Sequence, residues 1–145
     1  MAVYSLDQII DMITAWEKDL QKFYKKIKSR LAEEEAVQAV TLLSSDQEKM
    51  IKFLDQVSQN HHEKLEYHKN LPEYKNIVHG IDLNGPVTAK TFFEKIFDYE
   101  EELLKIYQNL RDIVTFDRSK EVLDMALQMK MGQIKKIKGC MDSFV

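Results

Sequence analysis

The chain has 145 residues and a formal net charge of −3, with 44% of its residues apolar and 31% charged. This length suits one domain with a single core, and the interspersed charges offer no basic surface for the phosphates of a nucleic acid. No apolar run could span a membrane and the first residues do not resemble a signal peptide, so we expect a cytoplasmic protein that contacts neither membrane nor nucleic acid.

The first half of the chain predicts two long helices. Only 4 Gly and 2 Pro interrupt the sequence, which favours an all-α class. Ser5 and Gln8 form a predicted capping box, and apolar residues then recur at spacings of three and four. A second helix is predicted from about Glu34 to His62, and the short loop before it indicates antiparallel packing.

The helical pattern is lost in residues 63–90. Leu71-Pro72 and Asn84-Gly85-Pro86 are strong helix breakers, so this segment is predicted to be a long connector. The chain has four histidines, two just before this segment and two within it, and they are interpreted as surface residues: His61, His62, His68 and His79.

The last part of the chain predicts a second helical pair. Thr91 and Glu94 form another candidate capping box, and a fourth helix, capped by Asp117 or Ser119, is predicted to end near Met141. The whole chain, residues 1–145, is therefore predicted to be a single four-helix bundle. Two antiparallel hairpins, 5–62 and 91–141, would be joined by one long crossover connection, 63–90.

The two predicted hairpins are similar to each other. A shift of 83 positions carries Glu17 onto Glu100 and Tyr24 onto Tyr107, and it also aligns apolar residues of the second and fourth helices. We interpret this similarity as an internal repeat. The two hairpins would then place equivalent residues at equivalent depths in the bundle.

Two carboxylates of the repeat lie on apolar stripes. Glu17 and Glu100 occupy positions where the helical period calls for an apolar side chain. A buried carboxylate costs several kcal/mol unless it is paired, protonated or bound to a metal, so a divalent metal site would explain both residues. The alternative is that each Glu lies at the edge of its stripe and reaches solvent or a lysine.

A Glu followed seven residues later by a Tyr on the first and third helices resembles the rubrerythrin branch of the ferritin-like superfamily. The pairs here are Glu17 with Tyr24 and Glu100 with Tyr107, and the resemblance covers roughly residues 5–141. It implies a ferritin-like bundle in which four Glu and two His hold two iron ions. Glu17 and Glu100 would be ligands, and the two tyrosines would donate hydrogen bonds beside them.

The second and fourth helices depart from the family pattern of Glu-x-x-His. The second reads Glu48-Lys49-Met50-Ile51 and the fourth reads Met131-Gly132-Gln133-Ile134, so both histidines are replaced by isoleucine. In this alignment the lost ligand positions are Ile51, Met131 and Ile134. A rotation of the fourth helix by one position would instead turn Lys130 or Gln133 inward, but no register supplies Glu-x-x-His.

The expected remnant is a metal-ligand set of three carboxylates, Glu17, Glu48 and Glu100. They would either bind one hard cation weakly or form a metal-free cluster that shares a proton and hydrogen bonds with Tyr24 and Tyr107. The metal-free form is the favoured interpretation. A di-iron enzyme that handles O₂ or peroxide is not expected from three oxygen donors.

We therefore expect a rubrerythrin-like protein with a degenerate di-iron site, no cofactor, and a role as a non-catalytic binding or interaction module. One alternative is an iron- or manganese-binding oxidoreductase or metal-storage protein. Another is a small molecule bound in the bundle core beside Trp16, Tyr99 and the two tyrosines of the repeat. The resemblance also implies a homodimer, for which Gly132 would allow close backbone approach; no protein partner is indicated.

Overall fold

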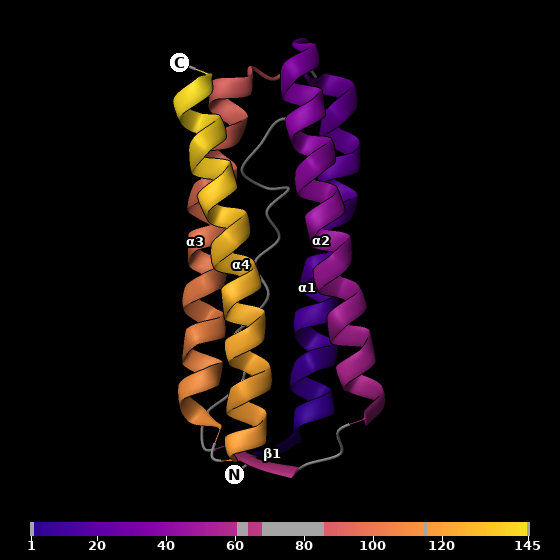
Figure 1. Cartoon of the computed structure of the whole chain (residues 1–145), viewed down its shortest axis with the longest axis vertical. Helices are drawn as coiled ribbons and strands as arrows, with labels where there is room; N and C mark the ends of the chain where they lie inside the picture. Colours follow the sequence, from indigo (N-terminus) through magenta and orange to yellow (C-terminus); the bar gives the residue numbers. More distant parts are fainter. Residues whose placement is uncertain (1, 61–63, 68–85, 115, 145) are drawn as a thin grey trace.

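The computed structural model describes residues 2–60, 64–67, 86–114 and 116–144 (Figure 1). Four long helices lie side by side in it: α1 (Leu6–Ile27), α2 (Glu34–Asn60), α3 (Ala89–Ile113) and α4 (Asp117–Ser143). A short 3-10 helix, η1 (Lys28–Arg30), follows α1. The predicted all-α class is confirmed, and the arrangement is compatible with a four-helix bundle.

A small two-stranded sheet at one end of the helices was not predicted. β1 (Ala2–Ser5) pairs antiparallel with β2 (Lys64–Tyr67), and the register places Ala2 opposite Tyr67. β2 lies within the segment predicted as a connector. Most of that connector, residues 68–85, and the four histidines lie outside the described residues.

The start of α3 differs from the sequence-based prediction. The helix begins at Ala89, and the N-cap is Thr88, whose Oγ1 accepts a hydrogen bond from the Thr91 amide at 3.2 Å. The predicted capping box at Thr91 is therefore wrong, because an equivalent hydroxyl three residues earlier caps the first turn. The preceding residue, Val87, donates its amide to the Arg30 carbonyl at 3.0 Å, which ties the start of α3 to η1.

The start of α4 also differs from the prediction. Phe116 occupies the N-cap position without a side-chain hydrogen bond, so neither Asp117 nor Ser119 caps the helix. Asp117 is instead the first helical residue, where its negative charge interacts favourably with the helix dipole. Ser119 is buried in the first turn of the helix, and α4 continues to Ser143, two residues beyond the predicted end at Met141.

Packing joins the helices around one apolar core. α1 packs against α2, α3 packs against α4, and α2 also contacts α4. Aromatic rings connect α1 with α3: the rings of Phe23 and Phe92 lie 6.1 Å apart, and Tyr24 meets Phe92 edge-on at 6.2 Å. Each fully buried aromatic ring contributes about 1.5–3 kcal/mol, so this layer holds together the two helices on which Glu17 and Glu100 lie.

Within the described ranges, no helix has both the length and the apolar character that crossing a bilayer requires.

Candidate functional site: a buried ionic cluster

Glu17 on α1 and Glu100 on α3 both point into the core. Their exposed fractions are 0% and 1%, so neither carboxylate reaches solvent from the edge of its apolar stripe. Two buried carboxylates at the same depth would repel each other in a medium that screens charge weakly. A positive group between the two carboxylates, or a proton on one of them, relieves this repulsion.

Lys130 supplies that positive charge from α4. Its side chain is 0% exposed, and its Nζ lies 2.7 Å from Glu17 Oε1 and 2.6 Å from Glu100 Oε2. The same ammonium donates a third hydrogen bond, at 3.1 Å, to Gln133 Oε1 on the next turn of α4. All three N–H bonds of the ammonium thus have acceptors, which is the condition under which a buried charge is tolerated.

The two tyrosines of the internal repeat bind the carboxylates crosswise. Tyr24 on α1 donates its hydroxyl to Glu100 Oε1 on α3 at 3.0 Å, and Tyr107 on α3 donates to Glu17 Oε2 on α1 at 2.7 Å. Each tyrosine therefore bonds to the Glu of the other repeat and not to the Glu on its own helix. This exchange links α1 and α3 through two charge-assisted hydrogen bonds.

α2 contributes Gln47 to the cluster, whereas Glu48 lies outside it. Gln47 is fully buried, and its Nε2 donates to Glu17 Oε1 at 3.3 Å. The Glu48 side chain is 58% exposed, with its carboxylate 3.9 Å from Lys52 Nζ on the same helix. The structure thus does not bring Glu48 together with Glu17 and Glu100. The apolar spacing from Val40 onward passes through Gln47, and this periodicity was the signal that would have identified the inward residue.

α4 is rotated by one position relative to the alignment with the family pattern, so that Lys130 and Gln133 face inward. Met131 is 53% exposed, while Lys130 and Gln133 are buried. The two isoleucines at the expected histidine positions, Ile51 and Ile134, are buried but make no polar contact with the cluster. The lost ligand positions named from the sequence are therefore one residue away from those that face the two carboxylates.

The same shift of 83 positions pairs the residues that do face inward. It carries Gln47 onto Lys130 and Met50 onto Gln133. Met50 is buried like the other three residues. The shift thus pairs two buried residues of α2, three apart, with two buried residues of α4 at the same spacing, which is the spacing of a Glu-x-x-His pair.

Burial and charge determine the protonation of the cluster. Burial lowers the pKa of Lys130, but the coulombic effects of Glu100 and Glu17 outweigh it and the pKa is raised, so the ammonium is charged at neutral pH. Burial raises the pKa of Glu100, and Lys130 opposes that shift. The pKa values of Tyr24 and Tyr107 are raised well above the ordinary value by burial and by the adjacent carboxylates, so both hydroxyls remain donors.

Two polar atoms of α2 beside this cluster have no partner among the described residues. Gln47 Oε1 and Ser44 Oγ are both buried and unbonded, three residues apart on the same helix face. Each unbonded buried group costs about 1–3 kcal/mol. Beside the site, α2 therefore carries buried polar atoms without a hydrogen-bond partner, while the Glu, Tyr and Lys groups of the cluster all form hydrogen bonds.

The donor set does not fit a di-iron centre. Among the described residues, no group of three His, Cys, Asp or Glu side chains could hold a metal ion. The Lys130 ammonium lies where a cation would have to contact both Glu17 and Glu100, and it would repel one. The remaining inward groups, Gln47, Met50 and Gln133, are weak ligands for iron or manganese.

No protein-family model, no curated protein and no solved structure matches this chain.

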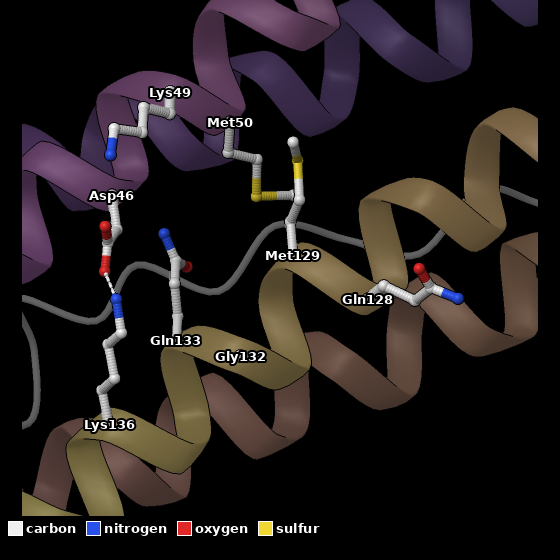
Figure 2. A pocket seen from close by; sticks show the side chains of 8 residues that line it. All are labelled: Asp46, Lys49, Met50, Gln128, Met129, Gly132, Gln133 and Lys136. Carbon is white, nitrogen blue, oxygen red and sulfur yellow. Dashed lines mark hydrogen bonds and ion pairs between the residues drawn. The ribbon is translucent and has the colours of Figure 1, made fainter.

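Two aromatic side chains pack together beside the cluster. Trp16 stacks on Tyr107 with ring centroids 6.1 Å apart, and both residues are buried. A pocket lies elsewhere, between α2 and α4, and Gln133, which lines it, also accepts a hydrogen bond from Lys130 (Figure 2). Neither Tyr24 nor Tyr107 lines that pocket.

Proposed function

We propose that this chain is a rubrerythrin-like, ferritin-like bundle in which Lys130 has replaced the di-iron centre, and that it acts as a non-catalytic binding or interaction module. The observation that carries the proposal is the position of Lys130 Nζ, within 2.7 Å of carboxylate oxygens of both Glu17 and Glu100. One fixed ammonium takes the place of the two metal ions between these carboxylates and compensates one of their two negative charges. It cannot change oxidation state or bind oxygen.

The topology proposed for the bundle is that of the family: two antiparallel hairpins, α1 with α2 and α3 with α4, joined by a long crossover connection. Support comes from the packing of α1 on α2 and of α3 on α4. The crosswise bonds of Tyr24 and Tyr107 provide further support, since they relate α1 to α3 as equivalent members of two repeats.

The residues that face inward on α2 and α4 support the loss of catalysis. Where the family has Glu-x-x-His, α2 carries Gln47 and Met50, and α4 carries Lys130 and Gln133. None of the four is a carboxylate or an imidazole: one is a cation, and the other three are neutral groups that are weak ligands for iron or manganese. The conserved geometry of the bundle would then serve binding through its surface or its side pocket, without redox chemistry.

Metal analysis of the parent and of a designed ligand set tests this proposal. The designed variant carries Gln47→Glu, Met50→His, Lys130→Glu and Gln133→His, which restores the family's four missing ligands at the positions that face inward. After titration with Fe(II) and Mn(II) and removal of free metal, elemental analysis should find none in the parent and about two ions per chain in the variant. Adding Glu17→Gln and Glu100→Gln to the variant is the matched control and should abolish the binding.

Two results would contradict the proposal. Stoichiometric metal in the parent, lost on Glu17→Gln with Glu100→Gln, would restore the alternative of an iron- or manganese-dependent oxidoreductase or storage protein. A designed variant that retains its helical circular dichroism but binds no metal would contradict the ferritin-like arrangement of the four inward positions.

A further inference from the structure

The pocket between α2 and α4 has a polar end and an apolar end. Its volume is ≈ 210 Å³. Figure 2 shows Asp46, Lys49 and the amide of Gln133 at one end and the thioethers of Met50 and Met129 at the other. Pockets for drug-sized ligands are larger, so an occupant of this one has to be a small molecule of only a few carbon atoms.

The apolar end is open because α4 has a glycine there. A Cβ built on Gly132 would meet nothing within 4 Å, so no other described residue packs closely against this position. Glycine is among the least favourable residues inside a helix, and here its effect is to leave the space beside Met129 unfilled.

The polar end favours an anion. Lys136 forms an ion pair with Asp46 that spans α4 and α2, so these two charges compensate each other. Lys49 forms no ion pair within the described part of the chain and leaves one uncompensated positive charge at the pocket. The Oε1 of Gln133 accepts from Lys130, so its amide NH₂ group faces the same end as a second donor (Figure 2).

We propose that this pocket binds a small organic carboxylate. The carboxylate accepts from Lys49 and from the Gln133 amide, and the short apolar chain lies over Gly132 between Met50 and Met129. This inference specifies the ligand class for the binding role proposed above and rests on that role, but it does not depend on whether the buried cluster is free of metal. Methionine side chains are flexible and polarizable, which suits the walls of a site for a small aliphatic chain.

Binding can be measured by titrating the ¹⁵N-labelled full chain with hexanoate and following amide shifts by NMR. Hexan-1-ol and hexylammonium, which have the same chain without the negative charge, are the comparison ligands. We expect saturable shifts of residues 49, 50, 129, 132 and 133 with hexanoate, and at least about tenfold weaker binding of both comparison ligands.

Gly132→Leu should fill the apolar end and weaken hexanoate binding by at least about tenfold, whereas Gly139→Leu should not change it. Gly139 is the matched control because it lies on the same helix, also has open space at its Cβ, and does not line the pocket. Gly132→Ala provides a second, milder filling variant and should give a smaller loss in the same direction.

The proposal is overturned if hexanoate gives no saturable shifts at millimolar concentration, if hexylammonium binds as well as hexanoate, or if Gly132→Leu binds like Gly139→Leu. These results would leave the metal titration of the parent chain unaffected. Failure of the carboxylate site and failure of the metal-free assignment can therefore be told apart.

Discussion

Lys130 Nζ lies 2.7 Å from Glu17 Oε1, although the two residues are 113 positions apart and come from the last and the first helix. With Glu100 it forms a buried Glu-Lys-Glu group in which one ammonium holds α1, α3 and α4 together. Such a group contributes little net stability compared with apolar residues of the same size, but breaking it leaves a buried charge without a partner. This asymmetry determines the expected behaviour of variants.

Removal of the buried ammonium should destabilise the fold strongly. Lys130→Met keeps the length of the side chain but leaves Glu17 and Glu100 without a cation, and we expect a loss of about 3–5 kcal/mol in the free energy of unfolding. Urea unfolding followed by fluorescence of Trp16, the chain's single tryptophan, measures it. Adding Glu17→Gln and Glu100→Gln to Lys130→Met should recover most of the loss. A single variant as stable as the parent would show that the three groups are not paired in solution.

Truncation of Glu17 and truncation of Glu48, two members of the predicted metal set, should change the free energy of unfolding by very different amounts. Glu48→Ala removes an exposed carboxylate and should change the free energy of unfolding by no more than about 0.5 kcal/mol. Glu17→Ala deprives Lys130 and Tyr107 of their acceptor and should cost roughly 3 kcal/mol or more. The two variants are compared in the same urea series. Equal effects would mean that α2 presents Glu48, and not Gln47, to the core.

Removing the hydroxyl of Tyr24 and removing that of Tyr107 should lower the free energy of unfolding by similar amounts, because the two tyrosines make equivalent hydrogen bonds to the two carboxylates. Tyr24→Phe and Tyr107→Phe each delete one hydrogen bond to a carboxylate and should each cost about 1.5–3 kcal/mol. Chemical denaturation of both variants and of the double variant measures the costs. The parent chain, measured in the same denaturation series, is the reference. A loss confined to one of the two cluster variants would contradict their equivalence.

Stability should fall steeply in alkaline solution. The pKa values of Tyr24, Tyr107 and Lys130 are all raised in the folded chain, so the folded state holds these protons more tightly than the unfolded state does. Their contribution is complete below the unfolded pKa values of about 10 and is lost as the pH rises towards the folded ones. Each group can lower the free energy of unfolding by up to about 1.4 kcal/mol per pH unit in that window.

Urea unfolding at a series of pH values from neutral to alkaline gives this slope. The double variant Tyr24→Phe with Tyr107→Phe has lost two of the three titrating groups and should show a shallower decline than the parent. Parallel curves for the parent and the double variant would show that the two phenols ionise equally in the folded and unfolded chains.

The amino-acid pattern alone was enough to predict long amphipathic helices and an all-α class. It also identified Glu17 and Glu100 as residues on apolar stripes, because helical periodicity is local and each stripe can be read from its own segment. The cap residues of α3 and α4 were missed, since Thr, Ser and Asp residues near each start are chemically able to cap a helix. The backbone path places Thr88 at the cap of α3, and it places Phe116, without a side-chain hydrogen bond, at the cap of α4.

The composition of the ionic cluster was decided by the tertiary structure. Lys130 lies on the apolar spacing of α4 and the exposed Lys135 and Lys136 do not, but this spacing does not show what the ammonium would meet in the core. Its burial depends on carboxylates from two other helices, which compensate the cost of removing the ammonium from water. In the same way, the apolar spacing of α2 passes through Gln47 but does not show that its amide meets Glu17. Local sequence determines which face of a helix is apolar, but the pairing of buried charges exists only once helices distant in sequence have packed together.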